Sequence, residues 1–491
     1  MQIVVKSSPT ATQQVTATGT EASDAVEKPV TVQPDGEEQI QTDGQLFSDS
    51  VKFETLVPTT VLSGTLRSTL KLYPNLLGHV FEGIEGILQR PHGCAEQTIS
   101  STYPNVMVLK YLAQLEQPEA VTTQRARDYT QQGIDRLLGY QHETGGFTYW
   151  GNGSPDLTLT AYAIRFLTDA QEFATVDESV IDWARRYVLS QQQTDGSWAF
   201  DNRYSSPVQS VYDLQQSAYV ALSLASSGEK SATFQKALDR LASQIATSDS
   251  PYWLAVTALA ASRAGQLDLA AQAVARLGKL IKPGTEQVSW NQSLETPFHG
   301  WGRAAEVETT ALALRAILAV TGNVQASDWQ SRFNRGLLYL LQNKDQHGVW
   351  LSTQASVAVW ELLFALNEQE REARKMASAL EVWVNGQPFK TIDLTGVENR
   401  LSPITVDLTE RFTSGRNQVE VRSQQPVALM SAQLMTRLYA PWTVEPGKVA
   451  HQSPDLNFNV NFDKIEATLS DVVTCRVDYE RKDRGNGMLL A

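Results

Sequence analysis

Residues 91–98 hold the side chains whose types and spacing could do chemistry, in the order Pro-His-Gly-Cys-Ala-Glu-Gln-Thr. The thiol of Cys94 and the side-chain amide of Gln97 are three positions apart, across a turn opened by Gly93, so they can meet. If the Cys94 sulfur attacks the Gln97 amide and ammonia leaves, an internal thioester forms. Such a bond is a stored acylating agent, because an amine or a hydroxyl can take the acyl group and release the thiol.

The wider segment carries more information than the spacing alone. A single cysteine is most often a small buried apolar residue, and Cys-x-x-Gln arises by chance in many sequences. Pro-x-Gly-Cys-x-Glu-Gln, however, resembles the thioester signature of the alpha-2-macroglobulin and complement family, usually Gly-Cys-Gly-Glu-Gln. Ala95 replaces the middle glycine, a departure that bacterial-type members tolerate. The resemblance implies a thioester between Cys94 and Gln97.

Four further residues are candidates for a supporting role. His92 lies two positions before Cys94 and could perturb the thiol after its release, although an ordinary turn residue is the simpler interpretation. Glu96 could orient the motif through hydrogen bonds, and Glu306 and Glu308 could line a helical ring. Solvated or helix-capping carboxylates are the default interpretation for all three.

Composition and charge limit the classes of function. A chain of 491 residues is expected to form two to four domains, and 42% apolar residues with 11 tryptophans provide for packed cores. The net charge of −13 argues against nucleic acid and anionic membrane surfaces as partners. The sequence has no apolar run long enough to span a bilayer, and its start does not resemble a signal peptide.

The cysteine count bears on the cellular compartment. Cys94 and Cys475 are the only two cysteines, so a thioester at Cys94 would leave no partner for an intrachain disulfide. Vertebrate members of the family are disulfide-rich secreted proteins, whereas bacterial members work in the periplasm. The resemblance therefore implies a periplasmic or extracellular full-length protein.

The middle of the chain has the apolar period of helices. Candidate helices cover residues 77–88, 97–115, 123–140, 157–170, 177–191, 213–226, 231–246, 251–264, 266–281, 304–320, 329–343 and 353–367. The loops between them repeat a glutamine followed by glycine and an aromatic residue, as in 141–147, 192–198 and 342–350. Such internal repeats predict a closed α/α toroid of about six helical hairpins.

On both sides of the helical region the apolar period switches to two, which is typical of strands. Strands are predicted over residues 46–72 and 380–439, with a tight hairpin at Asn385-Gly386. Neither group has enough strands to bury a face alone, so we expect them to form one sandwich. Further strands are predicted at 456–462 and 472–479. The apolar ending at residues 488–491 has no turn or tail, which suggests a fragment.

This order of elements is also similar to that of the macroglobulin family. The resemblance implies a linker or the end of a macroglobulin-like domain at 1–28, a CUB-like β domain at 29–72 and 377–440, and the thioester domain at 73–376. A truncated receptor-binding-type β domain follows at 448–491. Residues 29–36, 305–311 and 471–477 carry this resemblance beyond the motif. The bait region, where proteases cut in complete members, has no counterpart in this sequence.

The resemblance implies a protease trap. Bait cleavage exposes the thioester, and a lysine of the attacking protease is captured on the Gln97 acyl group in one covalent event without turnover. Target proteases and the remaining macroglobulin domains are the expected partners, and neither a cofactor nor a metal is required.

Two other functions remain as alternatives. Terpene cyclases and prenyltransferases share the α/α toroid, but the sequence has no Asp-x-Asp-Asp acid motif, no paired-histidine zinc motif and no clustered zinc ligands. A non-reactive binding scaffold is the second alternative, and detection of the thioester would separate it from the trap.

The choice of nucleophile follows from a missing histidine. Complement members that favour hydroxyls recruit a histidine from a loop downstream of the motif, and the corresponding residues 198–210 contain none.

We therefore predict that amines react with the thioester in preference to hydroxyls. Because a lysine with a pKa of about 10.4 is mostly protonated at neutral pH, capture should accelerate as pH rises. Competition between labelled methylamine and glycerol tests this. Preferential glycerol incorporation would show that another group, such as His92 or His299, supplies the catalysis.

Overall fold

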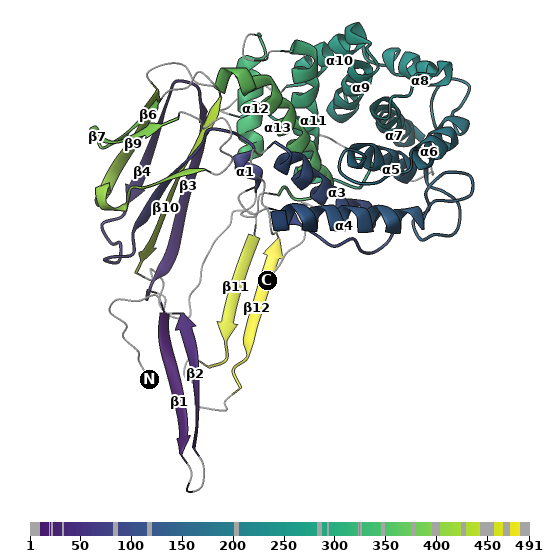
Figure 1. Ribbon diagram of the computed structural model, residues 1–491. Coiled ribbons are helices and arrows are strands. Elements are labelled where there is room, and N and C mark those ends of the chain that lie inside the picture. The colour runs from purple at the N-terminus through teal and green to yellow at the C-terminus, as the bar shows by residue number, and fades with distance from the viewer. Residues whose placement is uncertain are drawn as a thin grey trace.

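The computed structural model combines a ring of helices with antiparallel sheets (Figure 1). It describes residues 10–18, 20, 23–31, 34–81, 87–114, 120–200, 206–281, 287–291, 294–322, 324, 327–344, 349–374, 379–394, 403–423, 429–441, 456–464 and 472–481. A short helix, α1 (Gly78–Phe81), leads from the first strands into the helical region.

Alternate helices form a closed inner ring. Its members are α3 (Ala95–Leu112), α5 (Leu157–Ala170), α7 (Ser206–Ser226), α9 (Pro251–Arg263), α11 (Gly302–Thr321) and α13 (Thr353–Arg374). Each contacts the next, and α13 returns to contact α3. The ring confirms the predicted closed toroid.

A second layer of helices covers the ring from outside. It consists of α4 (Ala120–Leu138), α6 (Glu178–Ser190), α8 (Ala232–Ala242), α10 (Leu267–Lys279) and α12 (Gln330–Gln342), each packed on the inner helix that precedes it. These helices are amphipathic. In α8, for example, the buried residues Phe234, Ala237, Leu238 and Leu241 follow the i, i+3, i+4, i+7 spacing of a single buried face.

The repeated aromatic residues join the two layers. The backbone N–H of Trp198 donates to the Ser217 hydroxyl of α7 at 3.2 Å, and its indole N–H donates to the Val188 carbonyl at 2.9 Å, in the last turn of α6. Trp290 makes the same two kinds of bond to α11 and α10, and Trp350 makes them to α13 and α12. The predicted glycine-aromatic loops are thus repeated ties between an outer helix and the following inner helix.

Strands from both ends of the helical region build one β-sandwich. Its sheets have the orders β3-β10-β5-β8 and β4-β9-β6-β7. The strands are β3 (Glu37–Phe47), β4 (Ser50–Val57), β5 (Arg67–Tyr73), β6 (Ala379–Val384), β7 (Gln387–Asp393), β8 (Ile404–Asp407), β9 (Gly415–Ser423) and β10 (Met430–Ala440). A single apolar core, including Phe53, Leu70, Leu380 and Val419, lies between the sheets. The predicted insertion of the toroid in a β-sandwich is confirmed.

The predicted tight turn joins β6 to β7. Asn385 has φ of 51° and Gly386 has φ of 77°, as required at both central positions of the two-residue turn that matches strand twist.

Several elements differ from their predicted bounds. β3 begins at Glu37, where the sequence shows little periodicity, because it is an edge strand with mostly exposed side chains. α7 begins at Ser206 instead of residue 213. β1 (Thr10–Thr18) and β2 (Ser23–Thr31) form a hairpin in the predicted linker region, so residues 29–31 pair with β1. β11 (Leu456–Phe462) matches its predicted bounds, and its partner β12 (Cys475–Arg481) starts later than predicted. Residues 82–86, inside the predicted helix 77–88, and the apolar ending at residues 488–491 lie outside the part of the chain that the structure describes.

Charged side chains cross the centre of the ring. Glu361 of α13 pairs with Arg165 of α5 and with Arg315 of α11, and these three side chains are 6%, 8% and 12% exposed. Since α5 and α11 lie on opposite sides of the ring, the cluster spans it. Burial alone would raise the pKa of the Glu361 carboxyl, but the two guanidiniums outweigh burial and lower this pKa to about 2.

We predict that Glu361→Gln destabilises the toroid by about 3–5 kcal/mol at pH 7, because two buried guanidiniums lose their partner. The pKa of the Glu361 carboxyl is lower in the folded protein than its ordinary value of 4.5, so its ionisation stabilises the folded state above pH 4.5. This contribution is lost as the pH falls toward 2. The difference between wild type and variant should therefore shrink below pH 4.5. Urea unfolding, followed by the helical signal, measures this difference in stability.

Glu54→Gln is the control, because Glu54 forms an exposed ion pair with Arg416. This variant should lose at most about 1 kcal/mol of stability. Equal losses of stability in Glu361→Gln and Glu54→Gln would contradict the prediction.

Candidate functional site

Cys94 occupies the N-cap position of α3. Its backbone is extended, with φ of −73° and ψ of −178°, and its side chain is buried. Gly93 before it has φ of 76°, a left-handed conformation that favours glycine. Ala95 is the first helical residue, and its N–H donates to the Tyr149 carbonyl at 2.9 Å. The chain therefore turns sharply into α3 at the cysteine.

The Gln97 side chain folds back over this turn. Its Oε1 accepts a hydrogen bond from the Cys94 N–H at 3.1 Å, and the Gln97 N–H in turn faces the Cys94 side chain, in a capping-box arrangement. A Cβ at position 93 would lie 2.0 Å from Oε1, so the amide fills space that is open only above a glycine. The structure thus brings the thiol and the amide predicted to react into one helical turn.

Arg136 of α4 and Tyr140, in the turn that follows this helix, hold the same turn from the other side. Arg136 Nη2 donates to the Gly93 carbonyl at 2.6 Å, and the Tyr140 hydroxyl donates to the same oxygen at 2.9 Å. Arg136 Nε also donates to the Thr98 hydroxyl at 3.2 Å. We call Arg136 and Tyr140 the α4 clamp.

Sequence reasoning missed the α4 clamp, because its residues lie about forty positions from the motif. One signal was available. Gly133 lies inside a helical pattern, where a glycine usually indicates that another part of the chain packs closely against the helix. A Cβ at Gly133 would lie 2.1 Å from the Thr102 hydroxyl of α3. This close approach brings α4 within reach of the turn.

The two nearest candidates for a supporting role make local contacts. The exposed His92 ring has Nδ1 3.0 Å from the Arg90 carbonyl. Glu96, in the first turn of α3, accepts a hydrogen bond from the Ser100 hydroxyl at 2.6 Å. Both contacts fit ordinary structural roles in the turn and the helix.

The other candidates belong to α11 and the loop before it, separated from α3 by α13. The Glu306 carboxylate accepts a hydrogen bond from the Ser289 hydroxyl. Glu308 is buried, and burial raises the pKa of its carboxyl to about 7, although the Thr296 hydroxyl donates to it at 2.8 Å. Exposed His299 pairs through Nδ1 with Glu295 Oε2 at 2.8 Å. Glu308 thus faces the interior of the ring, as one of the sequence interpretations proposed.

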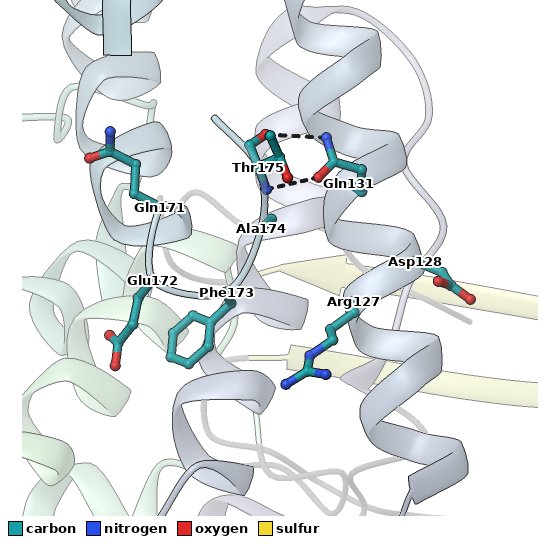
Figure 2. A pocket seen from close by; sticks show the side chains of 8 residues that line it. All are labelled: Arg127, Asp128, Gln131, Gln171, Glu172, Phe173, Ala174 and Thr175. Atoms are coloured by element: carbon teal, nitrogen blue, oxygen red, sulfur yellow. Dashed lines mark hydrogen bonds between the residues drawn. The ribbon is translucent and has the colours of Figure 1, made fainter. Parts of the chain in front are cut away.

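The described parts of the protein contain no cluster of three or more His, Cys, Asp or Glu side chains placed to hold a metal ion. A shallow cavity of about 410 Å³ lies between α4 and the loop after α5. Figure 2 shows Arg127 and Gln131 on its α4 side and Phe173 and Thr175 on the loop, with Gln131 bonded to Thr175. None of the residues that line this cavity belongs to the Cys94 turn.

Residues 70–366 match the family model of the A-macroglobulin TED domain. The chain belongs to the alpha-macroglobulin family. The match includes the whole inner ring up to most of α13 and therefore contains the turn at Cys94.

Solved structures of this family share the fold. Salmonella alpha-2-macroglobulin reacted with methylamine matches with a TM-score of 0.51 and 21% identity, over 96% of this chain and 29% of that chain. Native alpha-2-macroglobulin from Escherichia coli, spanning the residues from domain MG7 to the C-terminus, matches with a TM-score of 0.50 and 18% identity. That match covers 92% of this chain and 66% of that chain. This chain therefore spans only part of the length of both relatives.

The departure from the usual signature at Ala95 has a simple structural explanation. Ala95 is buried and is the first residue with helical backbone geometry in α3. Alanine favours this geometry over glycine by roughly 1 kcal/mol. The left-handed position of the turn is Gly93, which keeps the family residue.

Gly93→Ala should destabilise the protein more than Gly153→Ala. Both glycines have positive φ, 76° and 83°, so each alanine carries a backbone penalty of about 1–2 kcal/mol. A Cβ at Gly153 meets nothing within 4 Å, whereas a Cβ at Gly93 displaces Gln97. We expect about 1–3 kcal/mol of additional loss at Gly93, measured by urea unfolding of the helical signal. Equal losses for the two variants would contradict the observed packing of Gln97 on Gly93.

Proposed function

We propose that Cys94 and Gln97 form an internal thioester that acylates an amine of a target protein. The observation that carries the proposal is the position of the Gln97 side chain, folded over Gly93 with Oε1 on the Cys94 N–H at 3.1 Å. This conformation holds the amide carbon in the same turn as the sulfur. Attack by sulfur and loss of ammonia then require little rearrangement of the backbone.

The reaction with an amine is a single transfer. The amine nitrogen bonds to the Gln97 acyl carbon, the bond from that carbon to sulfur breaks, and the amine proton ends on the Cys94 thiol. Since no step restores the thioester, the protein acts as a covalent trap without turnover, an endopeptidase inhibitor when the amine is a protease lysine. The family relationship supports this role, and methylamine is the natural small probe because it has reacted with the Salmonella relative.

The proposal extends to the organisation and location of the full-length protein. The thioester domain covers 73–376 and the CUB-like domain covers 29–72 and 377–440, with 1–28 from the preceding segment and 448–491 from a receptor-binding-type domain. Other macroglobulin domains would shield the thioester from water in a periplasmic or extracellular protein. None of the described helices is both long and apolar enough to cross a membrane.

The centre of the ring favours the trap over a toroid enzyme. A toroid enzyme that used the centre of the ring would need open space there for its substrate. Here Glu361, Arg165 and Arg315 meet across the centre, and Phe298 packs between Tyr162 and Tyr219 with ring centroids 4.6 and 5.6 Å apart. A non-reactive scaffold is compatible with this packing and is separated from the trap by the following test.

We predict that the intact protein is lighter than its sequence by one ammonia and that a thiol reagent labels Cys94 only after methylamine treatment. Labelling under brief denaturation removes the protection due to burial, so it reports the covalent bond. Exposed Cys475 is an internal control, because it should label under all conditions. Gln97→Ala removes the acyl group, so its Cys94 should label without methylamine. Wild-type Cys94 that labels fully without methylamine would reject the thioester.

A further inference from the structure

We propose that the peptide group between Gly93 and Cys94 is the oxyanion donor of the thioester site, and that the α4 clamp polarises it. This inference rests on the proposed thioester chemistry and assigns it a catalytic group. The backbone N–H of Cys94 touches the reacting carbonyl, whereas Arg136 and Tyr140 act through the peptide and are positioning residues.

The three hydrogen bonds meet on one peptide plane. Its oxygen, the Gly93 carbonyl, accepts from Arg136 Nη2 at 2.6 Å and from the Tyr140 hydroxyl at 2.9 Å. Its N–H, which belongs to Cys94, donates to Gln97 Oε1 at 3.1 Å. Oε1 is the oxygen that stays on the acyl carbon when ammonia leaves. The same N–H can therefore donate a hydrogen bond to this oxygen in the amide and in the thioester. It can also do so in the tetrahedral intermediates that form when sulfur attacks the amide and when an amine attacks the thioester.

Negative charge develops on Oε1 in two steps. When the Cys94 sulfur bonds to the Gln97 acyl carbon, the carbonyl electron pair moves onto Oε1, and it returns as the nitrogen leaves with the thiol proton as ammonia. When an amine bonds to the thioester carbon, the pair again moves onto Oε1 and returns as the sulfur leaves with the amine proton. A donor fixed at hydrogen-bond distance stabilises both intermediates without reorganisation.

The α4 clamp should strengthen this donor. Hydrogen bonds to a peptide oxygen withdraw electron density from the peptide nitrogen and make its N–H a better donor, and such chains are cooperative. One of the two donors is a guanidinium, and charged donors make stronger hydrogen bonds than neutral ones. Arg136 is exposed to solvent, which limits its contribution. The loss of a direct oxyanion donor costs about 10²–10³ in rate, and loss of a polarising partner should cost less.

The fold explains why these two residues can act together. Gly133 and Arg136 are three positions apart, so they lie on the same side of α4. Tyr140 follows in the turn after α4, where its N–H donates to the Leu137 carbonyl at 2.9 Å. Gly133 lets the backbone of α4 approach Thr102 of α3, and the next turns carry Arg136 and Tyr140 to the Gly93 carbonyl. Arg136 is also held by its second bond to Thr98.

The test compares methylamine reaction rates in Tyr140→Phe, Arg136→Met and Arg136→Lys with the rate in wild type. Release of the Cys94 thiol follows the reaction. We expect Tyr140→Phe to be about threefold slower and Arg136→Met about tenfold slower, with partial recovery in Arg136→Lys because a charged donor is restored. Arg127→Met is the matched control. It makes the same substitution on the same helix, at the cavity beside Phe173 shown in Figure 2, and should react at the wild-type rate.

A spectroscopic measurement separates polarisation from a merely structural role. The infrared difference spectrum before and after methylamine isolates the thioester carbonyl band. A weaker hydrogen bond to Oε1 should move this band to higher frequency in Tyr140→Phe, which removes one hydroxyl and leaves the ring. The melting temperature of Tyr140→Phe should stay near that of wild type.

The outcomes are distinguishable from those of the thioester test. If wild type contains no thioester, the proposed function fails and this inference fails with it. If wild type reacts but Tyr140→Phe and Arg136→Met keep either the wild-type rate or the wild-type carbonyl frequency, the inference alone is overturned. A slower reaction together with a higher carbonyl frequency in Tyr140→Phe, at an unchanged melting temperature, supports it.

Discussion

The site depends on one packing constraint, which is that the Gln97 side chain occupies the space above Gly93. A side chain at position 93 would collide with the amide oxygen, and its positive φ would be strained. With glycine there, the amide lies on the Cys94 N–H and the sulfur caps the same helix. The α4 clamp holds this turn in place through the Gly93 carbonyl.

The toroid supplies a rigid support for the turn. Cys94 sits at the end of an inner helix, so its position is fixed by contacts of α3 with α4, α5 and α13. Repeated ties such as Trp198 join the two helical layers, and Glu361 links opposite sides of the ring. Such a frame would hold the proposed thioester in place.

The parts of the structure that could be predicted from sequence are those with local signals. The turn that joins Cys94 to Gln97 is encoded within five residues, and the ring follows from repeated apolar spacing and glycine-aromatic loops. β3 gave no such signal, because an exposed edge strand needs no alternation of apolar residues. The α4 clamp was also hidden, since Arg136 and Tyr140 reach Gly93 only when two helices cross at a particular distance. Charge and spacing along a sequence carry no information on that distance.

The most direct test of the thioester is to locate the products of its reaction in a single peptide. Wild-type protein is treated with isotope-labelled methylamine, then with a thiol reagent, and the peptide containing residues 91–98 is fragmented in a mass spectrometer. The thioester predicts the labelled methylamide on Gln97 and the thiol adduct on Cys94 of the same molecule. Methylamine absent from Gln97, in protein whose Cys475 has reacted normally, would contradict it.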